Sequence, residues 1–380
     1  IIDFLFLYTY IQNTYLKSTT RINISLFLFD YLEGHIVNKV REFLNPSILL
    51  MIVILLLSLS DYESANAQRR PPDVDRHEWS MRQKAKTDST YEALCEDVLD
   101  YRKTSYRSNV GDLDIPVYIF QPLEKRGKAG HAALVWVHEN LHGDLYSYYF
   151  PFIKEACDRG YVVIAPEYRG STGYGEDFYN KIDYGGYEVD DVVTAVDYLR
   201  KNLPHVDMDR VGIIGWSHGG MITILSTTRN PEMFKASAAI VPVTNLVFRL
   251  AFKGEGYMRN FENMPRVDGR PHEKRDIFLE RSPLYQVDKL QSPMLVHLAD
   301  SDTDVNYEEA EQLIWYLAEK KKDLVELKVY HNPTGSSGGH GFSRIVNRNT
   351  FEREDTAEQR DSWNRTWTFF EWYLRPYEGK

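Results

Sequence analysis

Short, almost wholly apolar runs alternate with helix-like stretches through most of this chain, and this alternation constrains its fold more than any other feature. The clearest runs are residues 132–138, 161–166, 210–216 and 293–299. A run without polar alternation is typical of a strand that is buried on both faces. Amphipathic segments such as 187–202 separate the runs. The pattern therefore predicts an α/β protein with a mostly parallel sheet and helices on both faces.

Further expected elements complete this sheet. Strands are expected at 116–121, 236–241 and 324–330, and helices at 149–159, 219–228, 308–320 and 366–374. One long stretch, 245–288, interrupts the alternation and is rich in aromatic and charged residues. We expect it to be an insertion that builds part of a substrate pocket.

Composition excludes several classes of protein. The formal net charge of -10 disfavours a general nucleic-acid binder, because such proteins are usually basic. Two cysteines are too few for a disulfide scaffold or a four-cysteine zinc site. The 43% hydrophobic content excludes a disordered chain and a polytopic membrane protein. Cys157 lies on the buried face of its expected helix, whereas its pairing with Cys95 and the oligomeric state stay open.

The first 36 residues show no steady hydrophobic period. They are rich in Ile, Leu, Phe, Tyr and Asn, and the first methionine of the chain is Met51. We expect residues 1–36 to be upstream sequence outside the working protein. A genuine extension or a membrane anchor is the alternative.

Residues 37–67 have the layout of a secretory signal peptide. Lys39 and Arg41 precede the apolar run 48–57, and a small-x-small pattern ends at Ala67. The run is too short to cross a bilayer, which needs about 20 residues. We expect cleavage after Ala67, a secreted or periplasmic protein, and no stable membrane span afterwards. An uncleaved anchor is the alternative.

The mature chain then divides into two parts. Residues 68–100 are polar and are expected to form an N-terminal strap. Residues 101–380 are expected to form the catalytic domain.

The strongest chemical motif is Gly215-Trp216-Ser217-His218-Gly219, which follows an expected strand and opens an expected helix. In that context G-x-S-x-G predicts a nucleophile on a sharp strand-to-helix turn, as in the α/β-hydrolase fold. Residues two before and two after the serine must be small, and both are glycine here. The N–H of His218 would face a developing oxyanion, while its side chain is expected to be structural.

A serine nucleophile needs a base and an orienting carboxylate, which follow it in the order Asp or Glu, then His. The segment after a late strand offers Asp300, Asp302 and Asp304, of which Asp302 is preferred. The other two are expected to shape the loop through bonds to its backbone. His340 lies in a loop after the last strand, whereas His331 ends that strand. We therefore expect His340 to be the base.

The segment His138-Glu139-Asn140-Leu141-His142 matches the zinc-peptidase pattern H-E-x-x-H. That chemistry needs both histidines on one face of a helix. Here the pentapeptide follows a strand and runs into glycine, so a helix would be broken at once. The segment fits better as the loop that supplies the second oxyanion N–H, from Glu139 or Asn140.

Residues 132–380 resemble the catalytic domain of the prolyl oligopeptidase family of serine peptidases. The stretches that carry the resemblance are 167–175 (EYRGSTGYG), 185–191, 209–217 (DRVGIIGWS), 282–285 (SPLY) and 302–305 (DTDV). The resemblance implies an α/β-hydrolase fold with an insertion after the sixth strand. It also implies Ser217 as nucleophile, Asp302 as orienting carboxylate and His340 as base.

The chain departs from the family pattern in two places. Residues 68–131 are too few for the β-propeller that usually precedes this domain. The family often has His-Gly-Gly after the third strand, where this chain has His138-Glu139-Asn140. A side chain therefore stands where glycine lets the backbone approach the oxyanion.

These features together predict an exported serine hydrolase that forms an acyl-enzyme on Ser217 and needs no metal or organic cofactor. A serine-type peptidase is favoured and a carboxylesterase of the same fold is the alternative. A zinc peptidase that uses His138 and His142, or a non-catalytic binding module, is a remote alternative. The expected partner is a small peptide or ester, with Tyr174 and Trp216 as substrate-binding candidates.

Overall fold

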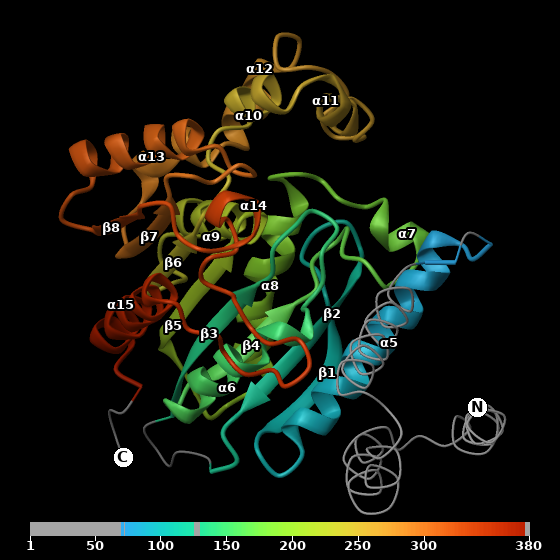
Figure 1. Ribbon diagram of the computed structural model, residues 1–380, viewed down its shortest axis with the longest axis vertical. Helices are drawn as coiled ribbons and strands as arrows, with labels where there is room; N and C mark the ends of the chain where they lie inside the picture. The colour runs from blue at the N-terminus through green and yellow to red at the C-terminus, as the bar shows by residue number, and fades with distance from the viewer. Residues whose placement is uncertain (1–69, 72, 125–129, 377–380) are drawn as a thin grey trace, which may run out of the picture. The chain divides into compact units, whose positions relative to one another are not determined.

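The computed structural model describes residues 70–71, 73–124 and 130–376; the expected leader and signal peptide, 1–67, lie outside the described residues. An eight-stranded sheet runs through the domain in the order β1-β2-β4-β3-β5-β6-β7-β8 (Figure 1). β2 pairs with β1 and β4 in antiparallel fashion, and the remaining pairs are parallel. The strands are β1 (Asp100–Arg107), β2 (Asp114–Gln121), β3 (His131–Val137), β4 (Val162–Pro166), β5 (Val206–Trp216), β6 (Ala236–Ile240), β7 (Met294–Ala299) and β8 (Val325–Tyr330).

Helices cover both faces of the sheet, as the sequence predicts. One apolar core joins the sheet to α8, α9 and α13, and a second joins its other face to α5, α6 and α15. The helices are α5 (Arg76–Cys95), α6 (Phe150–Asp158), α7 (Glu176–Tyr179), α8 (Tyr187–Asn202), α9 (His218–Arg229), α10 (Leu246–Lys253), α11 (Glu255–Glu262), α12 (Arg275–Glu280), α13 (Tyr307–Lys320), α14 (Ser336–Gly339) and α15 (Ala357–Leu374). The α/β-hydrolase fold predicted from the sequence is confirmed by this architecture.

The expected strap contains a long helix. α5 begins after Asp75, whose carboxylate accepts hydrogen bonds from the N–H groups of His77 (2.8 Å) and Glu78 (3.0 Å). Such a cap stabilises a helix N-terminus by satisfying N–H groups that have no partner within the helix. The helix then places Lys84 against two buried carboxylates, 2.7 Å from Glu167 and 3.4 Å from Asp144.

The insertion after β6 consists of short helices. α10, α11 and α12 lie above the sheet, next to α13 and α14 (Figure 1). α10 is tied to the loop after β7, because Lys253 lies 2.7 Å from the Asp304 carboxylate. Arg249 of the same helix is buried and lies 3.4 Å from Glu309 of α13. The insertion is therefore anchored to the end of the acidic loop that follows β7 and to α13.

Both cysteines lie in the described part of the chain. Cys95 ends α5 and Cys157 lies in α6, and both are buried thiols rather than halves of a disulfide. Both belong to the core beneath α5, α6 and α15. Among the described residues, no helix is both long and apolar enough to cross a bilayer.

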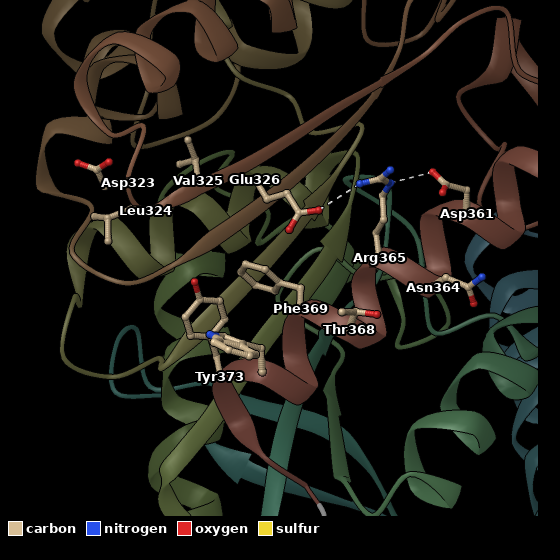
Figure 2. A pocket seen from close by; sticks show the side chains of 11 residues that line it. Asp323, Leu324, Val325, Glu326, Asp361, Asn364, Arg365, Thr368, Phe369 and Tyr373 are labelled. Carbon is tan, nitrogen blue, oxygen red and sulfur yellow. Dashed lines mark hydrogen bonds and ion pairs between the residues drawn. The ribbon is translucent and has the colours of Figure 1, made fainter.

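A hollow of about 570 Å³ lies between the edge strand β8 and α15 (Figure 2). Arg365 crosses it and lies 3.4 Å from Glu326 and 2.8 Å from Asp361. Trp372 is 75% exposed at its rim. None of the residues predicted to carry chemistry lines this hollow.

Candidate active site

Ser217 stands on a sharp turn between β5 and α9. Its backbone is left-handed, with φ 54° and ψ -117°, a conformation that a side-chain-bearing residue adopts only under constraint. A Cβ on Gly215 would lie 2.2 Å from the Gly219 carbonyl oxygen, and a Cβ on Gly219 would lie 2.4 Å from the His138 carbonyl oxygen. Both flanking glycines are therefore required by the close approach of the backbone.

Asp302 and His340 meet at the ends of β7 and β8. Asp302 Oδ2 lies 2.7 Å from His340 Nδ1, and both residues are almost fully buried. Asp302 Oδ1 accepts hydrogen bonds from the N–H groups of Asp304 (2.8 Å) and Val305 (2.9 Å), which fix the carboxylate. A carboxylate at Nδ1 holds the proton there and leaves Nε2 as the basic nitrogen.

The Ser217 hydroxyl makes no hydrogen bond to a described residue, so the serine–histidine bond is not formed in this structure. His340 Nε2 instead lies 3.6 Å from Asp304 Oδ2. Such bonds are often long without substrate and tighten when it binds. Ser217, like Asp302 and His340, is buried.

Asp304 differs from the expectation that it shapes the loop through backbone bonds. Its carboxylate forms ion pairs with Lys253 (2.7 Å) and Arg249 (3.6 Å) of the insertion. Burial works against the charged form, but the hydrogen bond from Lys253 and the nearby positive charges hold the pKa of Asp304 below its usual value. A negative charge therefore stands beside His340 without being part of the Asp302 pair.

Asp300 forms a second Asp–His pair with His331, at 2.8 Å, and accepts a bond of 2.7 Å from the Asn332 N–H. The His331 side chain is 85% exposed. This pair joins the ends of β7 and β8 at the surface. A structural role stays the expectation for both residues.

Two backbone positions are suited to hold an oxyanion. His218 is the first residue of α9, where N–H groups have no acceptor within the helix. Asn140, in the loop after β3, has φ 66°. Asparagine tolerates this left-handed conformation better than most residues, so it replaces the glycine of the family pattern at low cost. Glu139 and Asn140 both stay candidates for the second oxyanion N–H, and only Asn140 has the positive φ that glycine would adopt.

A family model described as the prolyl oligopeptidase family matches residues 148–358, which is more than half of the chain. The chain belongs to the prolyl oligopeptidase family. The match includes Ser217, Asp302 and His340, which the fold brings to the same end of the sheet.

Relatives of this family member are peptidases by name. The uncharacterized peptidase YuxL of Bacillus subtilis is 30% identical over 240 residues, covering 61% of this chain and 35% of that protein. Dipeptidyl aminopeptidase BIII of Pseudoxanthomonas mexicana is 30% identical over 199 residues, covering 51% of this chain and 28% of that protein. The matching regions span about a third of the length of these curated relatives.

A solved structure supports the fold of this family member. An acylaminoacyl peptidase of Pyrococcus horikoshii superposes with a TM-score of 0.57 at 22% identity, covering 76% of this chain and 45% of that one. At this identity the likeness establishes the α/β-hydrolase fold.

A buried pair behind the nucleophile was not predicted from the sequence. The His218 ring stacks on Tyr184, and its Nε2 lies 3.4 Å from Glu188 Oε1. Burial lowers the pKa of His218 to about 3. Burial, aided by the charge of Asp183, raises the pKa of Glu188 to about 8. Both groups are therefore predominantly neutral at pH 7.

The H-E-x-x-H segment of this family member is a loop, not a helix. The His138 ring bonds the Glu139 carbonyl (2.9 Å) and the Ser171 hydroxyl (3.0 Å). The His142 ring bonds the Gly170 carbonyl (2.8 Å) and stacks on Tyr179. Burial lowers the pKa of both rings to about 4. The two histidines therefore serve the loop after β3 and do not share a helical face.

Neither of the two substrate-binding candidates lines the pocket beside His340. Trp216 is fully buried, packs against Trp136 and Trp363, and donates to the Ser343 hydroxyl at 3.2 Å. It is a core residue, because its large indole ring is enclosed between Trp136 of β3 and Trp363 of α15. Tyr174 lies near Lys84 of α5, 5.7 Å from ring centre to Nζ, and not on the wall of the pocket beside His340.

Proposed function

We propose that this chain is a serine peptidase that cleaves short peptides through an acyl-enzyme on Ser217. His340 takes the proton from the Ser217 hydroxyl and then delivers it to the leaving amine. Asp302 holds the histidine ring and stabilises its charged form. The N–H groups of His218 and Asn140 bind the oxyanion.

The observation that carries this proposal is the buried Asp302–His340 pair, with 2.7 Å between Oδ2 and Nδ1. Its carboxylate is fixed by two backbone N–H groups, so the ring orientation is set before substrate arrives. The left-handed Ser217 turn at the same end of the sheet supplies the matching nucleophile.

Family membership supports a peptide substrate. Relatives carry the names dipeptidyl aminopeptidase and acylaminoacyl peptidase, so short peptides with a free or acylated amino end are the first substrates to test. Hydrolysis of esters by the same residues is the second candidate activity, because a serine acyl-enzyme forms from a peptide bond or from an ester bond.

A fluorophosphonate probe tests the nucleophile. We expect covalent labelling of the intact protein, lost in Ser217→Ala and kept in the matched control Ser89→Ala on the exposed face of α5. Labelling that survives Ser217→Ala would contradict the proposal. Activity that resists this change and is removed by a chelator would instead support zinc chemistry at His138 and His142.

A side-by-side assay then decides the substrate. Aminoacyl anilides, N-acylated short peptides and acyl nitrophenyl esters are compared by kcat/KM on one preparation. We expect peptide turnover that depends on Ser217. Strong ester turnover with no cleavage of any peptide would make the chain a carboxylesterase.

We also propose export, with residues 37–67 acting as a signal peptide cleaved after Ala67, residues 68–100 as the strap and residues 101–380 as the catalytic domain. The layout of Lys39, the apolar run 48–57 and Ala67 supports this. N-terminal sequencing of the protein from a secreting host should begin at Gln68. A product that retains the apolar run would contradict it.

A further inference from the structure

A pocket of about 410 Å³ opens beside His340, within the size range of small-molecule sites. It is built by the loop after β3, the loop after β7 and the segment that follows β8. Its polar wall is formed by Glu139, Tyr148, Asp304, Arg344 and Arg348, together with His340. The pocket therefore shares its histidine with the proposed triad.

Both oxygens of the Glu139 carboxylate already accept a hydrogen bond from the protein. The Tyr148 hydroxyl donates to Oε1, and an arm of the Arg344 guanidinium donates to Oε2. A carboxylate that is already paired with a guanidinium attracts a positively charged amine less strongly than an unpaired one. The role of Glu139 is to hold Arg344 in place.

Arg344 has a donor left over. The residue is only 7% exposed, and its Nη1 is buried without a hydrogen-bond partner in the described part of the chain. Burying a guanidinium donor without an acceptor is unfavourable, and the planar fork of arginine matches a carboxylate. An acceptor from a bound molecule would complete the set of bonds.

The charged side chains of the pocket also leave positive charge without a partner. Arg348 is exposed at the mouth, with its Cζ 4.0 Å from the Tyr148 ring centre, and it forms no ion pair with a described residue. The negative charge of Asp304, which also lines the pocket, is already met by Lys253 at 2.7 Å. Glu139 is paired with Arg344, so the charge of Arg348 is the one left without an ion-pair partner among the described lining residues.

We propose that this pocket binds the free C-terminal carboxylate of a short peptide substrate, through Arg344 and Arg348. The inference rests on the proposed function. A base that takes the serine proton returns it to the leaving amine, so the leaving fragment lies next to the histidine. A leaving fragment of one or two residues would bring its carboxylate into the pocket whose wall contains His340.

N-acylated dipeptides, each made with a C-terminal carboxylate and with a C-terminal amide, test this proposal. We expect the acid to be preferred over the amide by about tenfold or more in kcat/KM, the ratio that corresponds to ~1.4 kcal/mol. Arg348→Gln and Arg344→Lys should bring the acid-to-amide ratio close to one. The matched control Arg102→Gln, at an exposed position on β1, should keep the wild-type ratio.

Arg348→Gln keeps the test valid if the buried Arg344→Lys fails to fold. An acid-to-amide ratio near one in the unchanged protein would overturn the inference, as would a preference for the acid that both variants retain. A protein that reacts with the fluorophosphonate probe but cleaves no free-carboxylate peptide would also overturn it, and would leave the serine-hydrolase proposal standing. Loss of both labelling and cleavage would overturn the proposed function itself.

Discussion

At the scale of single residues, the loop after β7 carries two Asp–His pairs that look alike in the sequence and differ in place. Asp302–His340 is buried, whereas the histidine of Asp300–His331 is exposed. Only the buried pair has its carboxylate fixed by two N–H groups of its own loop. We assign chemistry to the Asp302–His340 pair alone. The Asp300–His331 pair therefore serves as an internal control.

We predict that Asp302→Asn lowers kcat by about 10⁴-fold, because the amide no longer holds the proton on His340 Nδ1. Asp300→Asn removes an equivalent charge two residues away and should change kcat by less than about threefold. The measurement is steady-state hydrolysis of the best peptide substrate. Equal losses in the two variants would show that the loop as a whole, and not the buried pair, sets the rate.

The glycines that flank Ser217 give a second prediction. Gly219→Ala would place a methyl group 2.4 Å from the Val137 carbonyl oxygen, so the turn must open. We expect a loss of about 2–4 kcal/mol in the free energy of unfolding. Gly256→Ala in the exposed α11 has only the Arg259 guanidinium, at 3.9 Å, near its new methyl, and should stabilise by up to about 1 kcal/mol. Denaturant unfolding measures both, and a tolerated Gly219→Ala would contradict the argument.

Glu188 predicts a pH dependence of stability. Because burial raises its pKa to about 8, the folded chain keeps a proton that the unfolded chain loses near pH 4.5. The contribution of this group therefore falls as pH rises from about 4.5 to about 8, by a few kcal/mol at most. Glu188→Gln is neutral throughout and should flatten that slope, raising Tm relative to the wild type most at pH 8. An unchanged slope would show that Glu188 is ionised in the folded chain.

The sequence predicted the groups proposed for chemistry better than their surroundings. G-x-S-x-G between a strand and a helix identifies Ser217, since the turn itself demands small neighbours. The pairing of Asp302 with His340 follows from the order of strands. The partners of Glu188 and Arg344 come from distant loops, and packing decides them, so no local pattern points to either. The sequence offers Trp216 as a substrate-binding candidate and the structure encloses it in the core, because adjacency to a nucleophile does not tell which layer receives the ring.

At the scale of elements, α5 is held to the sheet by one buried cation. Lys84 lies between Glu167 and Asp144, and its ammonium group is also 4.7 Å from the Tyr118 ring centre. Glu167 is fully buried, so removal of Lys84 would leave its carboxylate without this cation. The strap is thus a structural part of the domain and not a loose linker.

We predict that Lys84→Met destabilises the fold by about 3–5 kcal/mol, because two carboxylates are left buried without a cation. The loss should shrink at low pH, because burial raises the pKa of Asp144 and protonation removes its buried charge. Lys86→Met, at an exposed position on the same helix, should change stability by less than about 0.5 kcal/mol. Thermal unfolding at pH 5 and pH 8 checks both. Similar losses of stability in the two variants would mean that the ion pairs of Lys84 make no net contribution to stability.

The bounds of strands that are buried on both faces could be predicted closely from the sequence. Elements that are half exposed could not be predicted from it. The predicted strand 293–299 differs from β7 by one residue, because all its positions are apolar and enclosed. β1 was missed, since DYRKTSYR is half exposed at a sheet edge and shows no apolar alternation. The sequence predicts a polar strap and no helix at α5, because only Lys84, Tyr91 and Cys95 of this helix are buried.

At the scale of the whole molecule, the two thiols are enclosed in one core although they lie on separate helices. Burial raises the pKa of Cys95 to about 12. We predict that a disulfide-exchange reagent reacts slowly with the folded chain and with two thiols per chain once denaturant is added. Tm should be the same with and without reductant. Fewer than two reactive thiols in the unfolded chain would show that a disulfide forms.

The cap at Asp75 has a practical consequence for how this domain is used. Its carboxylate closes the first turn of α5, and neither apolar core takes a described side chain from before that helix. The start of α5 is therefore set by Asp75 itself. The helix should begin at the same residue whichever polypeptide is fused ahead of Asp75.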